Sequence, residues 1–181
     1  ARVDDYERIL SLDFSLFIFQ EVGSVAFSEI TLKIARSCPK EILKRYPLSA
    51  LRVAWAIRLI EKDAEFGVLM DGLDGQLKQD DPLMAEWLLL SAYRHYPHTD
   101  KMLSLVREAE PLFGGNCSRV ILPDAPWAFG GCLQMCEFHM KEGEADREAD
   151  ALGEFISIYS RLTNGHGCGA DALFRAELAY F

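Results

Sequence analysis

Apolar residues recur along most of the chain at intervals of three and four, the spacing that places side chains on one face of an α-helix. The pattern is clearest in two consecutive stretches, at Leu51, Trp55 and Leu59 and then at Phe66, Leu69, Met70 and Leu73. No strand-like run interrupts this pattern convincingly, and Ser118–Leu122 is the one patch with β character. The hydrophobic pattern therefore predicts an all-α protein.

Prolines and glycines set the predicted helix boundaries. Pro39 and Pro47 enclose a short turn, and Pro82 occupies the favoured first position of a helix. The first helix buries Ile9, Leu10, Phe14, Phe17 and Ile18. The predicted helices cover Asp4–Gln20, Ser24–Ser37, Leu48–Ile60, Ala64–Leu77, Leu83–Tyr93, His98–Leu112, Trp127–Met140 and Glu144–Leu162, and a last helix starts near Gly169.

From residue 48 onward the predicted helices come in pairs joined by short turns. Pairs open near Leu48, Leu83, Trp127 and Gly169, which is the period of a tetratricopeptide-like array. The sequence thus predicts an α-α superhelix of antiparallel helical hairpins, a solenoid in which each pair packs on its neighbours. The expected parts are irregular N-terminal helices (1–47), two hairpins (48–112), an irregular linker (113–126), and a third hairpin with the first helix of a truncated fourth (127–181).

The last predicted helix ends on an apolar run with no stop signal, at Leu178-Ala179-Tyr180-Phe181. This ending suggests a piece of a longer chain. It also predicts self-association through the last helix, because large bare apolar surfaces attract partners. The residues expected to be left uncovered are Leu173, Phe174, Leu178, Tyr180 and Phe181.

Three glycines separate the last two predicted helices, in the sequence Gly165-His166-Gly167-Cys168-Gly169. Glycine adopts positive φ without steric cost but weakens a helix. The spacing therefore predicts a tight turn that brings His166 close to the neighbouring pair, beside Trp127 or Tyr159. Two roles for His166 stay open: locking the turn and contacting a ligand.

Charge and composition narrow the classes of partner. A net charge of −9 and a pI near 4.9 oppose contact with phosphate backbones, so the chain itself is not expected to bind DNA or RNA. No apolar run approaches the length of a membrane span. The five cysteines show no disulfide-scaffold spacing, which favours reduced thiols and a cytoplasmic protein.

Motifs for catalysis or cofactor binding are lacking. The chain has no phosphate-binding loop, no H-E-x-x-H and no paired C-x-x-C, and we expect neither an enzyme nor a cofactor in this segment. Cys132, Cys136 and His139 lie at i, i+4 and i+7 and could hold zinc together with His166 or Cys168. Burial of small cysteines in a helical core is the favoured alternative, because one helix cannot easily surround a metal.

Aromatic and ionisable residues cluster in the last two predicted pairs. They could line a concave groove that binds an inducer or a protein partner. The alternative assigns the aromatic residues to the core between helices and the charged ones to a solvated face. The candidate binding residues are Trp127, Phe129, Tyr159, Arg161, His166, Arg175 and Glu177.

Three stretches carry a family resemblance: "LKRYPLSALRVAWAIRL" (43–59), "APWAFGG" (125–131) and "YSRLTNGHGCGADALFRAELAYF" (159–181). They resemble the helical-repeat region of bacterial LuxR-type transcription regulators of the MalT-like class. The tail is the most specific part. The matching residues there and in the second stretch are Pro126, Trp127, Phe129, Gly130, Tyr159, Arg161, Leu162, Thr163, Gly165, His166, Gly167, Gly169, Ala170, Arg175, Ala176 and Glu177.

The resemblance implies a parent protein with three parts: an N-terminal ATP-binding switch module, a helical-repeat sensor, and a C-terminal helix-turn-helix that binds DNA. This chain would be the middle part, which senses a small-molecule inducer or a protein. The cysteines at 132, 136 and 168 are not part of the family pattern, which weakens the metal hypothesis. The alternative function is a stand-alone tetratricopeptide-like adaptor that binds a protein partner. A catalytic all-α domain ranks third.

Overall fold

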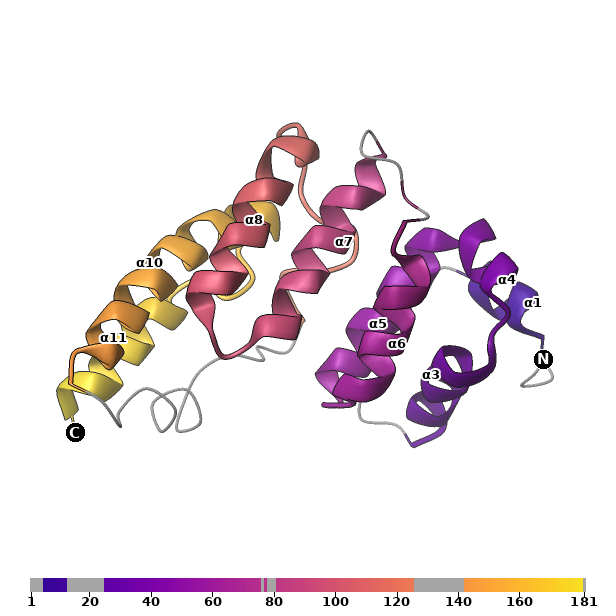
Figure 1. The fold of residues 1–181 in the computed structure, drawn as a ribbon, viewed down its shortest axis with the longest axis horizontal. Helices are drawn as coiled ribbons and strands as arrows, with labels where there is room; N and C mark the ends of the chain where they lie inside the picture. The colour runs from indigo at the N-terminus through magenta and orange to yellow at the C-terminus, as the bar shows by residue number, and fades with distance from the viewer. Residues whose placement is uncertain (1–4, 13–24, 76, 78–80, 126–141, 181) are drawn as a thin grey trace. The chain divides into compact units, whose positions relative to one another are not determined.

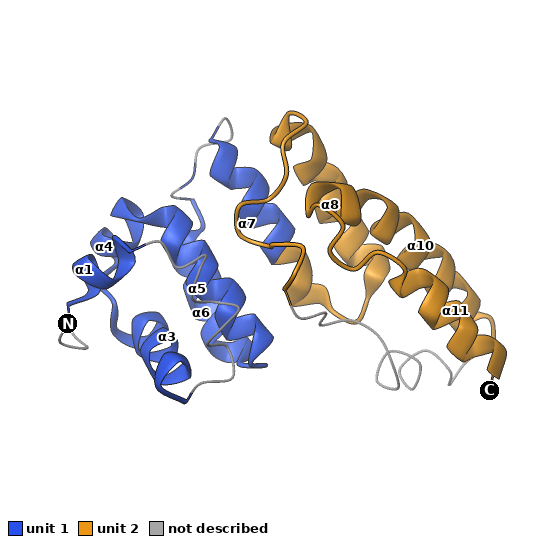
Figure 2. Ribbon diagram, turned by 180° about the vertical axis from the view of Figure 1, so that it is seen from behind, with its two compact units in different colours: residues 1–90 blue, residues 91–181 orange. Residues whose placement is uncertain are grey.

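A computed structural model describes residues 5–12, 25–75, 77, 81–125 and 142–180. Within these ranges every regular element is a helix and no strand is formed (Figure 1). The prediction of an all-α protein is therefore confirmed. The chain divides into two compact units, residues 1–90 and residues 91–181 (Figure 2), which are described separately below.

Unit 1 is built around a helix that water hardly reaches. Its helices are α1 (Tyr6–Leu10), α3 (Val25–Ser37), α4 (Lys40–Arg45), α5 (Pro47–Leu59), α6 (Asp63–Leu73) and most of α7 (Pro82–Ala92). Every residue of α5 is buried or half-buried, and Leu51, Trp55 and Ile57 have no exposed surface. Because α3, α4 and α6 all pack on α5, its apolar side chains are covered on all sides.

A tight turn joins α5 to α6 and makes them an antiparallel hairpin. Glu61 takes a left-handed conformation (φ 57°), and the Lys62 N–H reaches back to the carbonyl of Ile57 at 3.2 Å. Phe66, Leu69, Met70 and Leu73 are all buried, as the apolar spacing predicted. On the other side of α6, the Trp87 indole N–H of α7 donates to the Met70 carbonyl at 3.2 Å.

Two helices of unit 1 are shorter than predicted. The first ends at Leu10, and residues 11 and 12 leave the helix; the Ser11 hydroxyl donates to the Arg8 carbonyl at 2.8 Å, a local bond that competes with helix propagation. Ile9 and Leu10 are buried as predicted, whereas Phe14, Phe17 and Ile18 lie outside the described residues.

The helix predicted to reach Leu77 ends instead at Leu73. Asp74 is extended there, and Gly75 has a φ of 68°. An aspartate followed by a glycine in the left-handed region stops a helix even where the apolar spacing continues.

Unit 2 contains a short 3₁₀ helix, η1 (Tyr93–His95), followed by α8 (Thr99–Phe113), α10 (Glu144–Leu162) and α11 (Ala170–Tyr180). The observed α10 has the predicted bounds. Residues 114–125 form no helix. The Ser118 N–H donates to the Leu162 carbonyl at 2.6 Å, and the Ser118 hydroxyl accepts from the N–H groups of Val120 and Ile121. The patch with β character is therefore a turn anchored to the end of α10.

Helices α8 and α10 run side by side in the same direction (Figure 1). Three polar contacts join them, and the residue numbers rise together along both helices. Thr99 meets Glu148, Arg107 meets Glu154, and Glu110 meets Arg161. A rising register of this kind defines a parallel pair.

Helix α11 folds back along α10. The Arg175 guanidinium donates to the Asp150 carboxylate at 2.8 Å and to the Ala149 carbonyl at 3.2 Å, so the middle of α11 lies beside the first half of α10. Phe174 is only 1% exposed and belongs to the core, contrary to the expectation that it would be left uncovered. Leu173 and Tyr180 are 52% and 83% exposed, as expected of an uncovered face.

Candidate functional site

The turn between α10 and α11 is the most specialised backbone segment of unit 2. Gly165, Gly167 and Gly169 have φ values of 96°, 74° and 89°, a region that side chains with a Cβ rarely adopt. The Gly165 N–H donates to the Ser160 carbonyl at 2.7 Å, which closes the end of α10. The predicted tight turn is present, and each of its three glycines is required by backbone conformation.

His166 points from this turn into the interior. Its side chain is 2% exposed, and its Nδ1 lies 2.6 Å from the Tyr159 hydroxyl oxygen. The Thr163 hydroxyl donates to the Tyr159 carbonyl at 2.8 Å, which ties the start of the turn to the last turn of α10. The predicted approach of His166 to Tyr159 is thus observed, whereas Trp127 lies outside the described residues.

Tyr159 stands at the centre of a buried polar cluster. Its hydroxyl oxygen is also 2.6 Å from the hydroxyl oxygen of Tyr93 on η1, and its ring stacks on Phe155 with centroids 5.1 Å apart. Complete burial, followed by the neighbouring Tyr93, raises the pKa of Tyr159 well above its usual value of 10.0. The cluster of Tyr93, Tyr159 and His166 is called the tyrosine–histidine cluster below.

The charged candidates lie apart from this cluster. Arg161 forms an ion pair with Glu110 of α8, and Arg175 forms one with Asp150 of α10; both arginine side chains are more than half exposed. Glu177 is half-buried on α11, and its Oε2 has no hydrogen-bond partner among the described residues. Of the predicted binding residues in the described ranges, Tyr159 and His166 contact each other.

The remaining candidates lie outside the described residues. These are Trp127, Phe129 and the weak zinc set of Cys132, Cys136 and His139. Within the described part of the chain, no group of three or more histidine, cysteine or acidic side chains could hold a metal ion. Cys38, Cys117 and Cys168 are free thiols, and burial raises the pKa of the Cys38 thiol to about 11, so Cys38 is a poor nucleophile at neutral pH.

Sequence reasoning did not anticipate the buried roles of Tyr93 and Glu148. Tyr93 carries no motif that links it to Tyr159, and only the packing of η1 brings the two hydroxyls together. Glu148 did carry a signal, because it shares the apolar face of α10 with Leu152, Phe155 and Tyr159. Its carboxylate accepts from the hydroxyl and the backbone N–H of Thr99, and so caps the first turn of α8.

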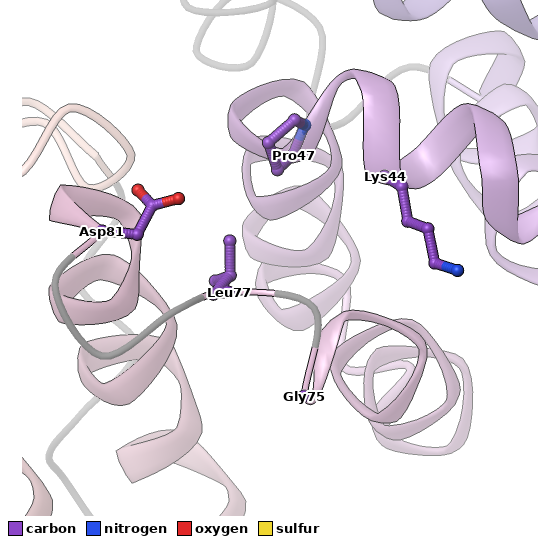
Figure 3. A pocket seen from close by; sticks show the side chains of 5 residues that line it. All are labelled: Lys44, Pro47, Gly75, Leu77 and Asp81. Carbon is purple, nitrogen blue, oxygen red and sulfur yellow. The ribbon is translucent and has the colours of Figure 1, made fainter.

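Unit 1 contains a surface cavity of about 430 Å³, lined by Lys44, Pro47, Gly75, Leu77 and Asp81 (Figure 3). Its charged groups already have local partners. Lys44 forms an ion pair with Glu41 at 3.0 Å and extends away from Asp81 (Figure 3), and the Asp81 carboxylate accepts from the Leu83 N–H at 2.8 Å. Among the described residues that line the cavity, the two charged side chains therefore do not converge on a common point.

Comparison of the chain with protein-family models, with curated proteins and with solved structures finds no match in any of the three. Among the described residues, no helix is both long enough and apolar enough to cross a membrane. The geometry of the described residues is thus the main guide to function. It presents a buried histidine held by a tyrosine, exposed arginines in ion pairs, and an apolar face on α11.

Proposed function

We propose that this chain is a sensor and interaction segment of a LuxR-type transcription regulator of the MalT-like class, and that it has no catalytic activity of its own. In this proposal the described hairpins belong to a tetratricopeptide-like superhelix. Binding of an inducer or partner to the superhelix would control DNA binding by a helix-turn-helix elsewhere in the parent. ATP would bind to a separate N-terminal module.

The observation that carries this proposal is the structural use of the tail residues on which the resemblance rests. Gly165, Gly167 and Gly169 all have positive φ, Thr163 bonds back to α10, and His166 is buried against Tyr159. These matched residues of the turn have a backbone or packing reason, as a junction between helices requires. It is the kind of element that a repeat sensor needs at the boundary between pairs.

The helix arrangement within unit 2 supports the same proposal. In a hairpin solenoid the second helices of consecutive pairs run parallel, and each first helix runs antiparallel to the helix before it. Helices α8 and α10 are parallel, and α10 and α11 are antiparallel. Exposed Leu173 and Tyr180 on α11 offer a surface for a neighbouring helix, a second copy or a partner.

His166 is assigned an architectural role in this proposal. A side chain that is 2% exposed and bonded to Tyr159 has little surface left for an inducer. The intact gene product with His166→Gln should therefore melt at a lower temperature than the parent. Its reporter induction should be retained below that temperature. Loss of induction without any loss of thermal stability would instead assign the imidazole to the inducer site.

The regulator function is tested on the intact gene product. When the gene is tagged at its chromosomal locus, the tagged protein should enrich specific promoter DNA in a cross-linking pull-down. The reading frame beyond Phe181 should encode further helical pairs and then a basic helix-turn-helix. The isolated 181-residue chain should bind duplex DNA negligibly at physiological salt, because its net charge is −9.

The second candidate is a stand-alone adaptor, favoured by the exposed apolar residues of α11. A short reading frame after Phe181, with no promoter enrichment and with a protein partner lost on Leu173→Asp, would support the adaptor over the regulator. Leu112→Asp is a matched control, since Leu112 is also an exposed leucine of unit 2 but lies on α8.

A further inference from the structure

In the tyrosine–histidine cluster, the Tyr159 hydroxyl has more polar neighbours than it has hydrogens to donate. The Tyr159 hydroxyl carries one hydrogen and lies 2.6 Å from two polar neighbours, the Tyr93 hydroxyl and Nδ1 of His166. Because it can donate to only one of them, donation to His166 leaves it to accept from Tyr93. Donation from Tyr159 to His166 therefore fixes the direction of both hydrogen bonds.

Energetics favour one of the two directions. A hydroxyl that accepts a hydrogen bond becomes a stronger donor, and chains of such bonds reinforce one another in a water-free interior. An unprotonated imidazole nitrogen is a strong acceptor, and a short O–H···N bond satisfies it. The arrangement in which Tyr93 donates to Tyr159 and Tyr159 donates to His166 satisfies both conditions.

We propose that Tyr93, Tyr159 and His166 form a directed hydrogen-bond relay, through which Tyr93 on η1 sets the tautomer of His166 and the order of the glycine turn. Nδ1 is then the acceptor, and Nε2 carries the hydrogen. The relay is a conformational device: a change that moves η1 reaches the junction of α10 and α11 without touching it. This inference does not rest on the regulator function.

The direct test is ¹⁵N NMR of the imidazole of His166 in the full 181-residue chain at neutral pH. The relay predicts an acceptor-type Nδ1 and a protonated Nε2 in the unchanged protein. Removing the Tyr93 hydroxyl with Tyr93→Phe should shift the Nδ1 resonance through the change at Tyr159. Tyr180→Phe is the matched control, because Tyr180 is 83% exposed, and it should leave the His166 signals unchanged.

Amide hydrogen exchange provides a second measurement. In Tyr93→Phe the N–H of Gly165, which bonds the Ser160 carbonyl, should exchange faster by about 2-fold to 10-fold, the effect of weakening one hydrogen bond. Amides in the middle of α8 should change less. A uniform increase across unit 2 would indicate only a general loss of stability and would overturn the relay.

If Tyr93→Phe does not fold, the ¹⁵N NMR spectrum of the unchanged protein still tests the direction of the relay. A hydrogen on Nδ1 of His166, in either the reversed tautomer or the doubly protonated ring, would contradict the proposed direction. Identical His166 resonances in the unchanged protein and in a folded Tyr93→Phe variant would show that Tyr93 has no influence on the turn.

Discussion

The central helices of the two units are buried by different means. All of α5 in unit 1 is buried or half-buried, and apolar neighbours surround it. Helix α10 in unit 2 instead alternates buried residues such as Leu152 and Phe155 with exposed ones such as Asp150 and Glu154. Besides its buried apolar residues, its contact with α8 includes polar pairs at fixed positions.

This difference predicts two kinds of sensitivity to mutation. A helix covered by apolar side chains on all sides depends on filled volume, so large-to-small changes should be costly wherever they fall. A helix held by matched polar groups depends on particular pairs, because an unsatisfied buried polar group costs more than a missing apolar contact at the surface. The predictions below test this contrast, from the largest expected effect to the smallest.

Trp55→Ala should have the largest effect. Trp55 lies on α5 with no exposed surface, and truncation would leave a cavity in the core of unit 1. We expect a loss of roughly 3–5 kcal/mol in the free energy of unfolding. Urea denaturation measures it. Val68→Ala, at an apolar position of α6 that is 58% exposed, is the control and should change stability by well under about 1 kcal/mol.

Glu148→Ala should be the most damaging polar change in unit 2. It removes the carboxylate that caps α8 and leaves the buried hydroxyl and N–H of Thr99 without this acceptor. The expected loss is about 1–3 kcal/mol. Glu154→Ala is a close match on the same helix, because Glu154 also pairs with α8 through Arg107 but is exposed, and it should cost at most about 1 kcal/mol. Equal losses would contradict the contrast between buried and exposed partners.

The same glycine-to-alanine change should have opposite signs in the two units. At Gly165 (φ 96°) a new Cβ would meet no atom within 4 Å, so the cost is purely conformational, about 1–2 kcal/mol. At Gly67, inside α6, a Cβ also meets nothing, and alanine should stabilise the helix by about 0.5–1 kcal/mol. Thermal unfolding of the two variants tests the signs. Gly165→Asn should be milder than Gly165→Ala, because asparagine tolerates positive φ better.

Alkaline pH should weaken unit 2 through Tyr159. Its pKa is raised in the folded state, so its contribution to stability is complete below the unfolded value of about 10 and is lost as the pH rises towards the folded value. Above pH 10 the unfolded chain should gain up to about 1.4 kcal/mol per pH unit from this one group. Urea unfolding between pH 8 and 11 should show a smaller pH slope in Tyr159→Phe. An unchanged slope would mean that Tyr159 ionises with equal ease in both states.

The smallest effect is expected at the surface of unit 1. The hydrogen bond from Arg36 lowers the pKa of Glu65, whose side chain is 18% exposed. Arg36→Ala should return that pKa towards its usual value, measured by NMR titration of the carboxyl carbon. The lowered pKa favours the folded state above the unfolded pKa and loses this effect as the pH falls, so the variant should flatten the acid limb of the stability profile slightly.

Local signals made several features predictable from the sequence. The three- and four-residue spacing of apolar side chains is imposed by the geometry of the helix itself, so the all-α class and the bounds of α10 followed from it. The glycines at 165, 167 and 169 predicted a turn because few other residues accept positive φ. Ser11 and the pair Asp74-Gly75 carried stop signals, but the continuing apolar spacing outweighed them in the prediction.

The sequence by itself indicated most of the described helices, where the sharpest turn lies, and that His166 would approach α10. The segment between Pro39 and Pro47, predicted as a short turn, is instead the helix α4. The tertiary structure alone decided that Phe174 is core, that Tyr93 meets Tyr159, and that Glu148 caps a helix 49 residues away through Thr99. The physical reason is the separation along the chain over which each effect acts. Helix periodicity and glycine conformation act within a few residues. The pairing of two hydroxyls or the capping of one helix by another requires the packed chain to bring distant residues within hydrogen-bonding distance.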